Sequence, residues 1–128
     1  MDKIVNLLKE KRLTLSCAES LTGGLFASSI TDVSGASNVF KGGIVSYTNE
    51  IKENVLGVSS STLKNQGAIS EECCFQMAQN VKNKFNTDIG ISFTGNAGPT
   101  ASENKPVGLV YFGVSYLNKC EVFKLNLN

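Results

Sequence analysis

Between an apolar run at 14–18 and a helical pattern at 22–30 lies the turn Ala18-Glu19-Ser20-Leu21-Thr22-Gly23-Gly24. A strand that passes into a helix through such a turn is the repeating unit of layered α/β proteins. At the junction, unpaired backbone N–H groups and the positive end of the helix can hold a phosphate or a developing oxyanion. The turn therefore predicts an α/β fold and places a candidate binding site at the same point.

Outward from this turn, strand-like and helix-like segments alternate along the chain. Helices are expected over 2–11, after an N-cap at Asn49, and after an N-cap at Ser70, with an apolar stripe of Cys74, Ala78, Val81 and Phe85, and residues 60–66 are expected to form a short turn or helix. Strands are expected over 41–48, 89–93, 107–116 and 120–127, the last two as a hairpin, and a loop over 31–40. This alternation predicts a layered α/β domain, and the hairpin makes its sheet mixed.

The composition is that of one globular domain spanning residues 1–128. Apolar residues make up 41% of the chain and the net charge is +1, which gives no reason to expect a nucleic-acid or membrane partner. No apolar stretch approaches the ~20 residues of a membrane span, and no secretory signal follows Met1, so we expect a cytoplasmic protein. The four cysteines lack the paired spacing of zinc sites and are expected in the core, not at a metal.

The chain contains no histidine, which narrows the chemistry open to Ser20. Ser20 either caps the following helix or acts as a nucleophile whose adduct is stabilised by N–H groups around Gly23 and Gly24. A nucleophilic serine here needs another base, and a lysine with a pKa below the usual ~10.4 can serve. Tyr47 and Lys52 are either a strand-end tyrosine and a solvated lysine, or a proton relay and a base facing the cleft of Ser20.

A second glycine-containing loop, Thr94-Gly95-Asn96-Ala97-Gly98-Pro99, follows the strand at 89–93. It is either an ordinary turn or a site where a hydroxyl and free N–H groups bind a phosphate or a carbonyl. Ligands of α/β sheets gather at the carboxyl ends of strands, so the loops 19–24, 46–52 and 94–99 are expected to converge. Glu19 either orients this site or is a solvated charge, and the polar segment 100–105 is expected to be mobile.

Taken in order, these motifs resemble the C-terminal domain of the CinA (competence/damage-inducible) family. The matching stretches are AES-TGG at 18–24, TDVSGAS at 31–37, GGIVSYTNEIK at 42–52, LGV at 56–58, GAISEE at 67–72, TGNAGP at 94–99 and KPVG at 105–108. Stand-alone members of this family are nicotinamide-nucleotide amidohydrolases, also called nicotinamide mononucleotide deamidases, which act in pyridine nucleotide salvage.

The resemblance implies a three-layer α/β/α sandwich with a mixed, mostly parallel sheet that ends in a C-terminal hairpin. It also implies hydrolysis of the carboxamide of nicotinamide mononucleotide to nicotinate mononucleotide and ammonia, without a cofactor or a metal. Ser20 would be the nucleophile, Tyr47 and Lys52 would activate it, and Thr94 would lie beside the reacting amide. The residues expected to bind substrate are Glu19, Thr22, Gly23, Gly24, Gly42, Asn49, Gly95, Asn96, Ala97 and Gly98.

The chain departs from the family pattern at three places. Leu21 replaces a cysteine, Asn96 replaces an apolar residue, and residues 100–104 replace an Asp-Gly-Gly segment. Family members also continue past the last strand into a basic helix, and without it an apolar sheet face would favour a homo-oligomer. Two alternatives are therefore a non-catalytic nucleotide-binding or interaction domain, and an amidase for another pyridine or small carboxamide.

Overall fold

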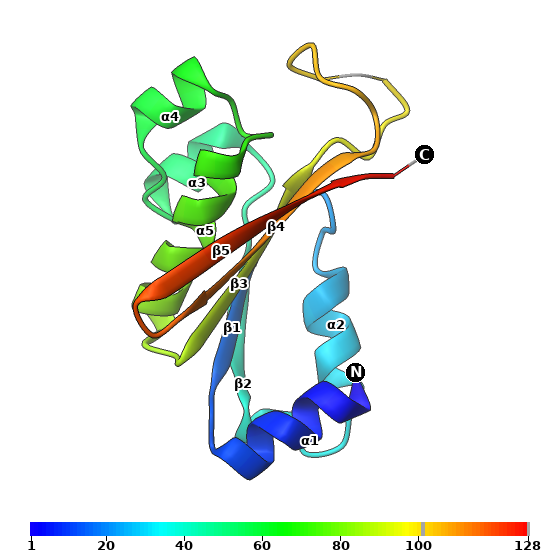
Figure 1. Ribbon diagram of the computed structural model, residues 1–128, viewed down its shortest axis with the longest axis vertical. Helices are drawn as coiled ribbons and strands as arrows, with labels where there is room; N and C mark the ends of the chain where they lie inside the picture. The colour runs from blue at the N-terminus through cyan, green and yellow to red at the C-terminus, as the bar shows by residue number, and fades with distance from the viewer. Residues whose placement is uncertain (101, 128) are drawn as a thin grey trace.

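The computed structural model describes residues 1–100 and 102–127, which form a five-stranded sheet flanked by helices (Figure 1). The elements are α1 (Asp2–Lys11), β1 (Leu15–Glu19), α2 (Leu25–Thr31), η1 (Ala36–Asn38), β2 (Phe40–Val45), α3 (Asn49–Asn54), α4 (Ser60–Asn65), α5 (Glu71–Phe85), β3 (Ile89–Gly95), β4 (Leu109–Tyr116) and β5 (Lys119–Asn126). The strand order is β2-β1-β3-β4-β5. The predicted α/β class, with a mixed sheet and a terminal hairpin, is confirmed.

The direction of the strands brings the loops of the candidate site to one end of the sheet, where the parallel strands have their carboxyl ends. β1 pairs in parallel with both β2 and β3, whereas β4 and β5 are added antiparallel. The chain therefore leaves the end of β1 for β2 on one side and reaches β3 on the other. Such a reversal opens a crevice outside the carboxyl ends of the strands. Ser20, Ser46 and the loop after Thr94 all lie at this end.

Apolar side chains fill the space on both faces of the sheet and make three layers. On the face covered by α3, α4 and α5, Met77 and Val81 of α5 pack with Ala18 of β1. On the face covered by α1 and α2, Val5 and Ile30 pack with other buried apolar residues (Figure 1). The predicted stripe of α5 is confirmed, because Cys74, Ala78 and Val81 are fully buried and Phe85 packs on the core.

A row of aromatic rings runs from α2 across the sheet towards its far edge. Phe26 of α2 lies 5.1 Å from Phe93, which lies 6.3 Å from Phe112, and Phe112 lies 4.8 Å from Phe123, between ring centroids. Phe93 and Phe112 are half-buried, and Phe123 of β5, at the end of the row, is 41% exposed. The chain thus has an exposed apolar patch, and the expected homo-oligomer that would cover it stays a prediction.

Several predicted boundaries move by a few residues. The helix expected at 22–30 starts at Leu25, because Gly23 and Gly24 have φ of 60° and 105°, which a right-handed helix excludes. Thr48, not Asn49, is the N-cap of α3, since its extended backbone lets the side chain accept from Ile51 N. The strand expected at 41–48 ends at Val45, and the loop expected at 31–40 contains η1.

The cysteines lie among core residues, as their apolar neighbours predict. Cys17, Cys73 and Cys74 are buried and Cys120 is half-buried. Burial raises the pKa of Cys17 and Cys74 to about 12 and that of Cys73 to about 11, which keeps these thiols protonated at neutral pH. Within 1–100 and 102–127, no cluster of three or more cysteine or acidic residues could hold a metal, and no helix could span a membrane.

The polar segment expected to be mobile is tied to the body of the protein in its described part. Ser102 and Lys105 form an isolated bridge, and the carboxylate of Glu103 accepts from the N–H groups of Ala68 and Ile69. Residues 102–105 are therefore not a free loop, and the reason is a contact between segments about 35 residues apart. Residue 101 lies outside the described residues.

Candidate active site

The side chain of Lys52 is the centre of the site. It projects from α3 into the interior and is only 1% exposed. Its Nζ lies 2.9 Å from Ser20 Oγ, 2.7 Å from the carbonyl oxygen of Ser46 and 3.2 Å from that of Tyr47. These three acceptors match the three N–H bonds of an ammonium group. The predicted meeting of Ser20 with Lys52 is thus present in the structure.

The two carbonyl contacts decide where the lone pair of a neutral Lys52 points. A carbonyl oxygen can only accept, so each carbonyl keeps an N–H of the amine directed at it. The remaining position on the nitrogen faces Ser20 Oγ, which can donate its proton in return. A neutral Lys52 is therefore held with its lone pair towards the serine hydroxyl, as a general base requires.

The surroundings of Lys52 favour its neutral form. Burial lowers the pKa of Lys52 below the ordinary value of 10.5, and the negative charge of Glu103 opposes this only in part. Its direct partners are a hydroxyl and carbonyls, none of which carries a full negative charge. The direction of the shift agrees with the pKa expected of a lysine that activates a serine.

The rate of any reaction that needs neutral Lys52 is expected to rise with pH through this lowered pKa. Below the pKa the nitrogen carries a proton and has no lone pair for Ser20, so kcat/KM falls about tenfold per pH unit. The measurement is a pH profile of kcat/KM on a substrate that the wild type turns over. A profile that stays flat from pH 5 to alkaline pH would contradict a lysine base.

Ser20 is held by the backbone on either side of it. Its N–H donates to the carbonyl of Phe93 at 3.0 Å, which continues the pairing of β1 with β3 for one residue beyond the strand. Its own carbonyl accepts from Gly23 N at 3.1 Å and closes the following turn. The side chain is 7% exposed and lies at the cavity wall. Ser20 is therefore fixed at the edge of the sheet rather than serving as a helix cap.

Glu19 caps α2 in place of Ser20. Its carboxylate, 1% exposed, accepts from the N–H groups of Gly24, Phe26 and Ala27 at 3.1, 3.0 and 2.9 Å. Burial alone would raise the pKa of Glu19, but the Thr22 hydroxyl and the N–H groups of Ala27 and Phe26 favour its charged form and lower the pKa below the ordinary 4.5. Of the two readings of Glu19, the structure supports an orienting role and excludes a solvated charge.

This cap corrects the expectation that Gly23 and Gly24 cradle a ligand. Their N–H groups are already donated to Ser20 O and to the Glu19 carboxylate, so they are not available to a phosphate or an oxyanion. Neither glycine lines the cavity beside Ser20, and Thr22 does not line it either. The N–H groups of Gly23 and Gly24 therefore have a local, structural role, and the predicted binding role of Thr22 stays a prediction.

The cavity beside Ser20 and Lys52 has a volume of about 360 Å³. Its lining residues come from the ends of the parallel strands, from α3, from the segment between α4 and α5, and from the chain after β3: Ser20, Leu21, Tyr47, Asn49, Lys52, Ala68, Ile69, Thr94, Gly95, Asn96, Ala97, Gly98, Thr100, Ser102 and Glu103. The predicted residues Asn49 and 94–98 are among them. Thr94 is 1% exposed and its hydroxyl donates to the carbonyl of Ala68 at 2.8 Å.

Two other predicted residues lie differently from expectation. Gly42 pairs with Ser16, three residues before the end of β1, and a Cβ there would meet the ring of Phe85. It therefore makes room for α5 and does not line the cavity. Tyr47 lines the cavity with a side chain that is 73% exposed, and its hydrogen bond to Lys52 comes from its carbonyl. The predicted relay through its phenol stays a prediction.

Sequence reasoning missed one wall of this cavity. Ala68, Ile69, Ser102 and Glu103 line it, and all were taken as connecting segments. The GAISEE stretch at 67–72 entered the sequence analysis only as part of the family pattern, yet the carbonyl of Ala68 in this stretch accepts from the Thr94 hydroxyl. A charged residue such as Glu103 in a segment next to a glycine loop was the available signal.

Comparisons with known proteins identify the family of this chain. The family described as CinA C-terminal domain matches residues 1–128. A competence-damage inducible protein of Bacillus thuringiensis (strain Al Hakam) is 52% identical over 128 residues, which cover 99% of this chain and 31% of that protein. The chain thus spans about a third of the length of the curated relatives that it matches.

Solved structures share the whole fold. The crystal structure of the competence damage-inducible protein A from Klebsiella pneumoniae superposes with a TM-score of 0.96 at 29% identity, covering 98% of this chain and 79% of that one. The competence/damage inducible protein from Agrobacterium tumefaciens gives a TM-score of 0.94 at 35% identity, covering 98% and 78%. Since the family match covers the chain from end to end, this protein belongs to the CinA C-terminal domain family.

Proposed function

We propose that this domain is an amidohydrolase that converts nicotinamide mononucleotide to nicotinate mononucleotide and ammonia, with Ser20 as nucleophile and Lys52 as base. The observation that carries the proposal is the buried Lys52 nitrogen, 2.9 Å from Ser20 Oγ, with its other N–H bonds directed at two main-chain carbonyls. The family resemblance supplies the substrate, and the geometry supports the chemistry.

The proposed reaction has two halves. Neutral Lys52 takes the proton of Ser20, and Oγ attacks the carboxamide carbon to form a tetrahedral adduct. The lysine ammonium then gives that proton to the carboxamide nitrogen. The C–N bond breaks, ammonia departs, and an ester remains on Ser20. In the second half Lys52 takes a proton from water, the hydroxide attacks the ester, and the proton returns to Oγ as nicotinate mononucleotide forms.

The remaining cavity residues would bind the nucleotide. Tyr47 and Asn49 line the side next to Lys52, and residues 95–98 line the side next to Thr94. The N–H groups of Asn96 and Gly98 donate to the Leu109 carbonyl and to Asn96 Oδ1, so in this loop the N–H group of Ala97 is the donor that we expect to face the oxyanion. We further propose that this reaction serves pyridine nucleotide salvage.

The test is ammonia release from nicotinamide mononucleotide by the wild type and by Ser20→Ala. We expect the variant to lose about a thousandfold or more in kcat, because the nucleophile is gone while the fold remains. Ser28→Ala is the matched control, since Ser28 is an exposed serine on α2, and it should keep full activity. Equal ammonia release by Ser20→Ala would rule out this mechanism, and tight nucleotide binding without turnover by the wild type would favour the non-catalytic alternative.

A further inference from the structure

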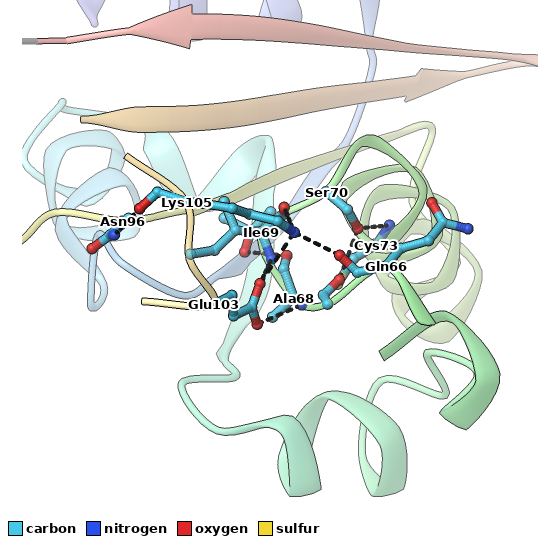
Figure 2. Close-up of polar contacts among 10 residues, drawn as sticks. Gln66, Ala68, Ile69, Ser70, Cys73, Asn96, Glu103 and Lys105 are labelled. Carbon is cyan, nitrogen blue, oxygen red and sulfur yellow. Dashed lines mark hydrogen bonds and ion pairs between the residues drawn. The ribbon is translucent and has the colours of Figure 1, made fainter. Parts of the chain in front are cut away.

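Residues 102–105, which we call the strap, join the loop after β3 to the segment between α4 and α5 (Figure 2). Glu103 accepts from Ala68 N at 2.9 Å and from Ile69 N at 3.1 Å. Lys105 Nζ donates to the carbonyls of Gln66 and Ile69 and lies 3.3 Å from Glu103 Oε1. One carboxylate and one ammonium group thus bind both the N–H and the C=O groups of residues 66–69.

Two further residues are fitted to the strap. Gly67 has φ of 85°, and a Cβ at this position would collide with the Glu103 carboxylate. Asn96 is 5% exposed and its Nδ2 donates to the carbonyl of Lys105 at 3.2 Å, while its Oδ1 accepts from Gly98 N. The departure from the family pattern at Asn96 therefore contacts the strap at Lys105, which in turn pairs with Glu103.

The segment held by the strap decides the direction of the Thr94 hydroxyl. Ala68, whose N–H is bound to Glu103, uses its carbonyl to accept the Thr94 proton at 2.8 Å. A carbonyl cannot donate, so the proton of Thr94 is committed and its oxygen keeps only lone pairs for the cavity that it lines. Thr94 is therefore presented to a ligand as an acceptor.

We propose that Glu103 is a positioning residue that makes Thr94 the acceptor selecting a carboxamide over a carboxylate; this inference rests on the proposed function. The –NH₂ of a carboxamide donates to Thr94 Oγ1. The product carboxylate brings only lone pairs to the same point and is repelled. Loss of ammonia thus turns a favourable contact into an unfavourable one, which holds the substrate and expels the product.

The test measures equilibrium binding in a Ser20→Ala background, where no turnover occurs. The probes are nicotinamide mononucleotide and nicotinate mononucleotide, which differ in the group that faces Thr94, and the readout is the ratio of their two Kd values. We expect Thr94→Val to reduce the preference for the amide by about tenfold, the size of one buried hydrogen bond. Thr94→Ser should keep the preference, and Glu103→Gln should reduce it about fivefold, because glutamine accepts through only one oxygen.

A purely structural role for Glu103 would weaken both nucleotides equally and leave the Kd ratio unchanged, and that result would overturn the inference. Glu53→Gln, at an exposed position of α3, is the matched control. Failure of nicotinamide mononucleotide to bind would also contradict the inference. Ammonia release by the otherwise wild-type enzyme reports on the proposed function separately, so active enzyme with an unchanged ratio would reject the inference alone.

Discussion

Replacing Lys52 with methionine is expected to lower kcat for ammonia release by about a thousandfold, within the range typical of a lost general base. Methionine fills a similar volume but has no basic nitrogen to take the proton of Ser20 Oγ, which lies 2.9 Å from Lys52 Nζ in the wild type. The unfolding free energy should change by less than about 2 kcal/mol, because relief from burying an amine offsets the loss of donors to two carbonyls. Activity assays beside urea denaturation separate the two effects.

The pH dependence of stability gives a second readout for the same variant. The folded-state pKa of Lys52 is lowered, so between that value and the unfolded value near 10.4 the unfolded chain binds more protons. Wild-type stability from Lys52 therefore rises with pH across this window, and Lys52→Met should lack this increment. Lys41→Met, at an exposed position of β2, is the control and should match the wild type in both assays. Full activity in Lys52→Met would remove the lysine from the mechanism.

Glu19→Ala is expected to cost about 3 kcal/mol of unfolding free energy, the largest stability effect that we predict. The change leaves the N–H groups of Gly24, Phe26 and Ala27 without their acceptor, in a part of the protein that water does not reach easily. Activity should fall with it, since Ser20 follows Glu19 directly. Urea denaturation at pH 7 provides the measurement.

The effect of Glu19→Ala should depend on pH with a definite sign. The pKa of Glu19 is lowered on folding, so its contribution is fully present above the unfolded value near 4.3 and is lost as pH falls through the folded value. The difference in unfolding free energy between wild type and variant should therefore become smaller at acid pH. Glu10→Ala, at an exposed position of α1, is the control. A difference that stays constant down to pH 2 would show that the Glu19 charge does not act as the cap.

Much of the site could be predicted from sequence because its residues follow parallel strands. Ser20 directly follows β1, Lys52 lies one helical turn after the loop that leaves β2, and Thr94 is the next-to-last residue of β3. Parallel strands deliver their carboxyl ends to a single edge, so hydroxyl and amine groups at those positions must come together. The patterns predict the strands and helices, and the absence of histidine points to a lysine, but the roles of these residues were assigned from the family resemblance.

The sequence did not identify the N-cap of a helix where two neighbouring residues could both act as the cap. Ser20 and Glu19 are both able to cap a helix, and only the geometry of the turn shows that Glu19 reaches the N–H groups of α2. Thr48 and Asn49 pose the same choice one residue apart. The strap was missed for a different reason: contacts of Glu103 with Ala68 and Ile69 join distant segments, and no local pattern reports them.

The main chain and the side chain of Tyr47 have different roles: the carbonyl accepts from Lys52, and the side chain lines the cavity. The oxygen that holds Lys52 belongs to the main chain, which every amino acid supplies, while the side chain faces the cavity and is largely exposed. Substitution at position 47 can therefore alter the cavity wall and leave the support of the lysine nitrogen in place. A substitution at position 47 can change which ligands the cavity accepts while the main-chain hydrogen bond to Lys52 is kept. Position 47 is therefore where we would begin to redesign specificity.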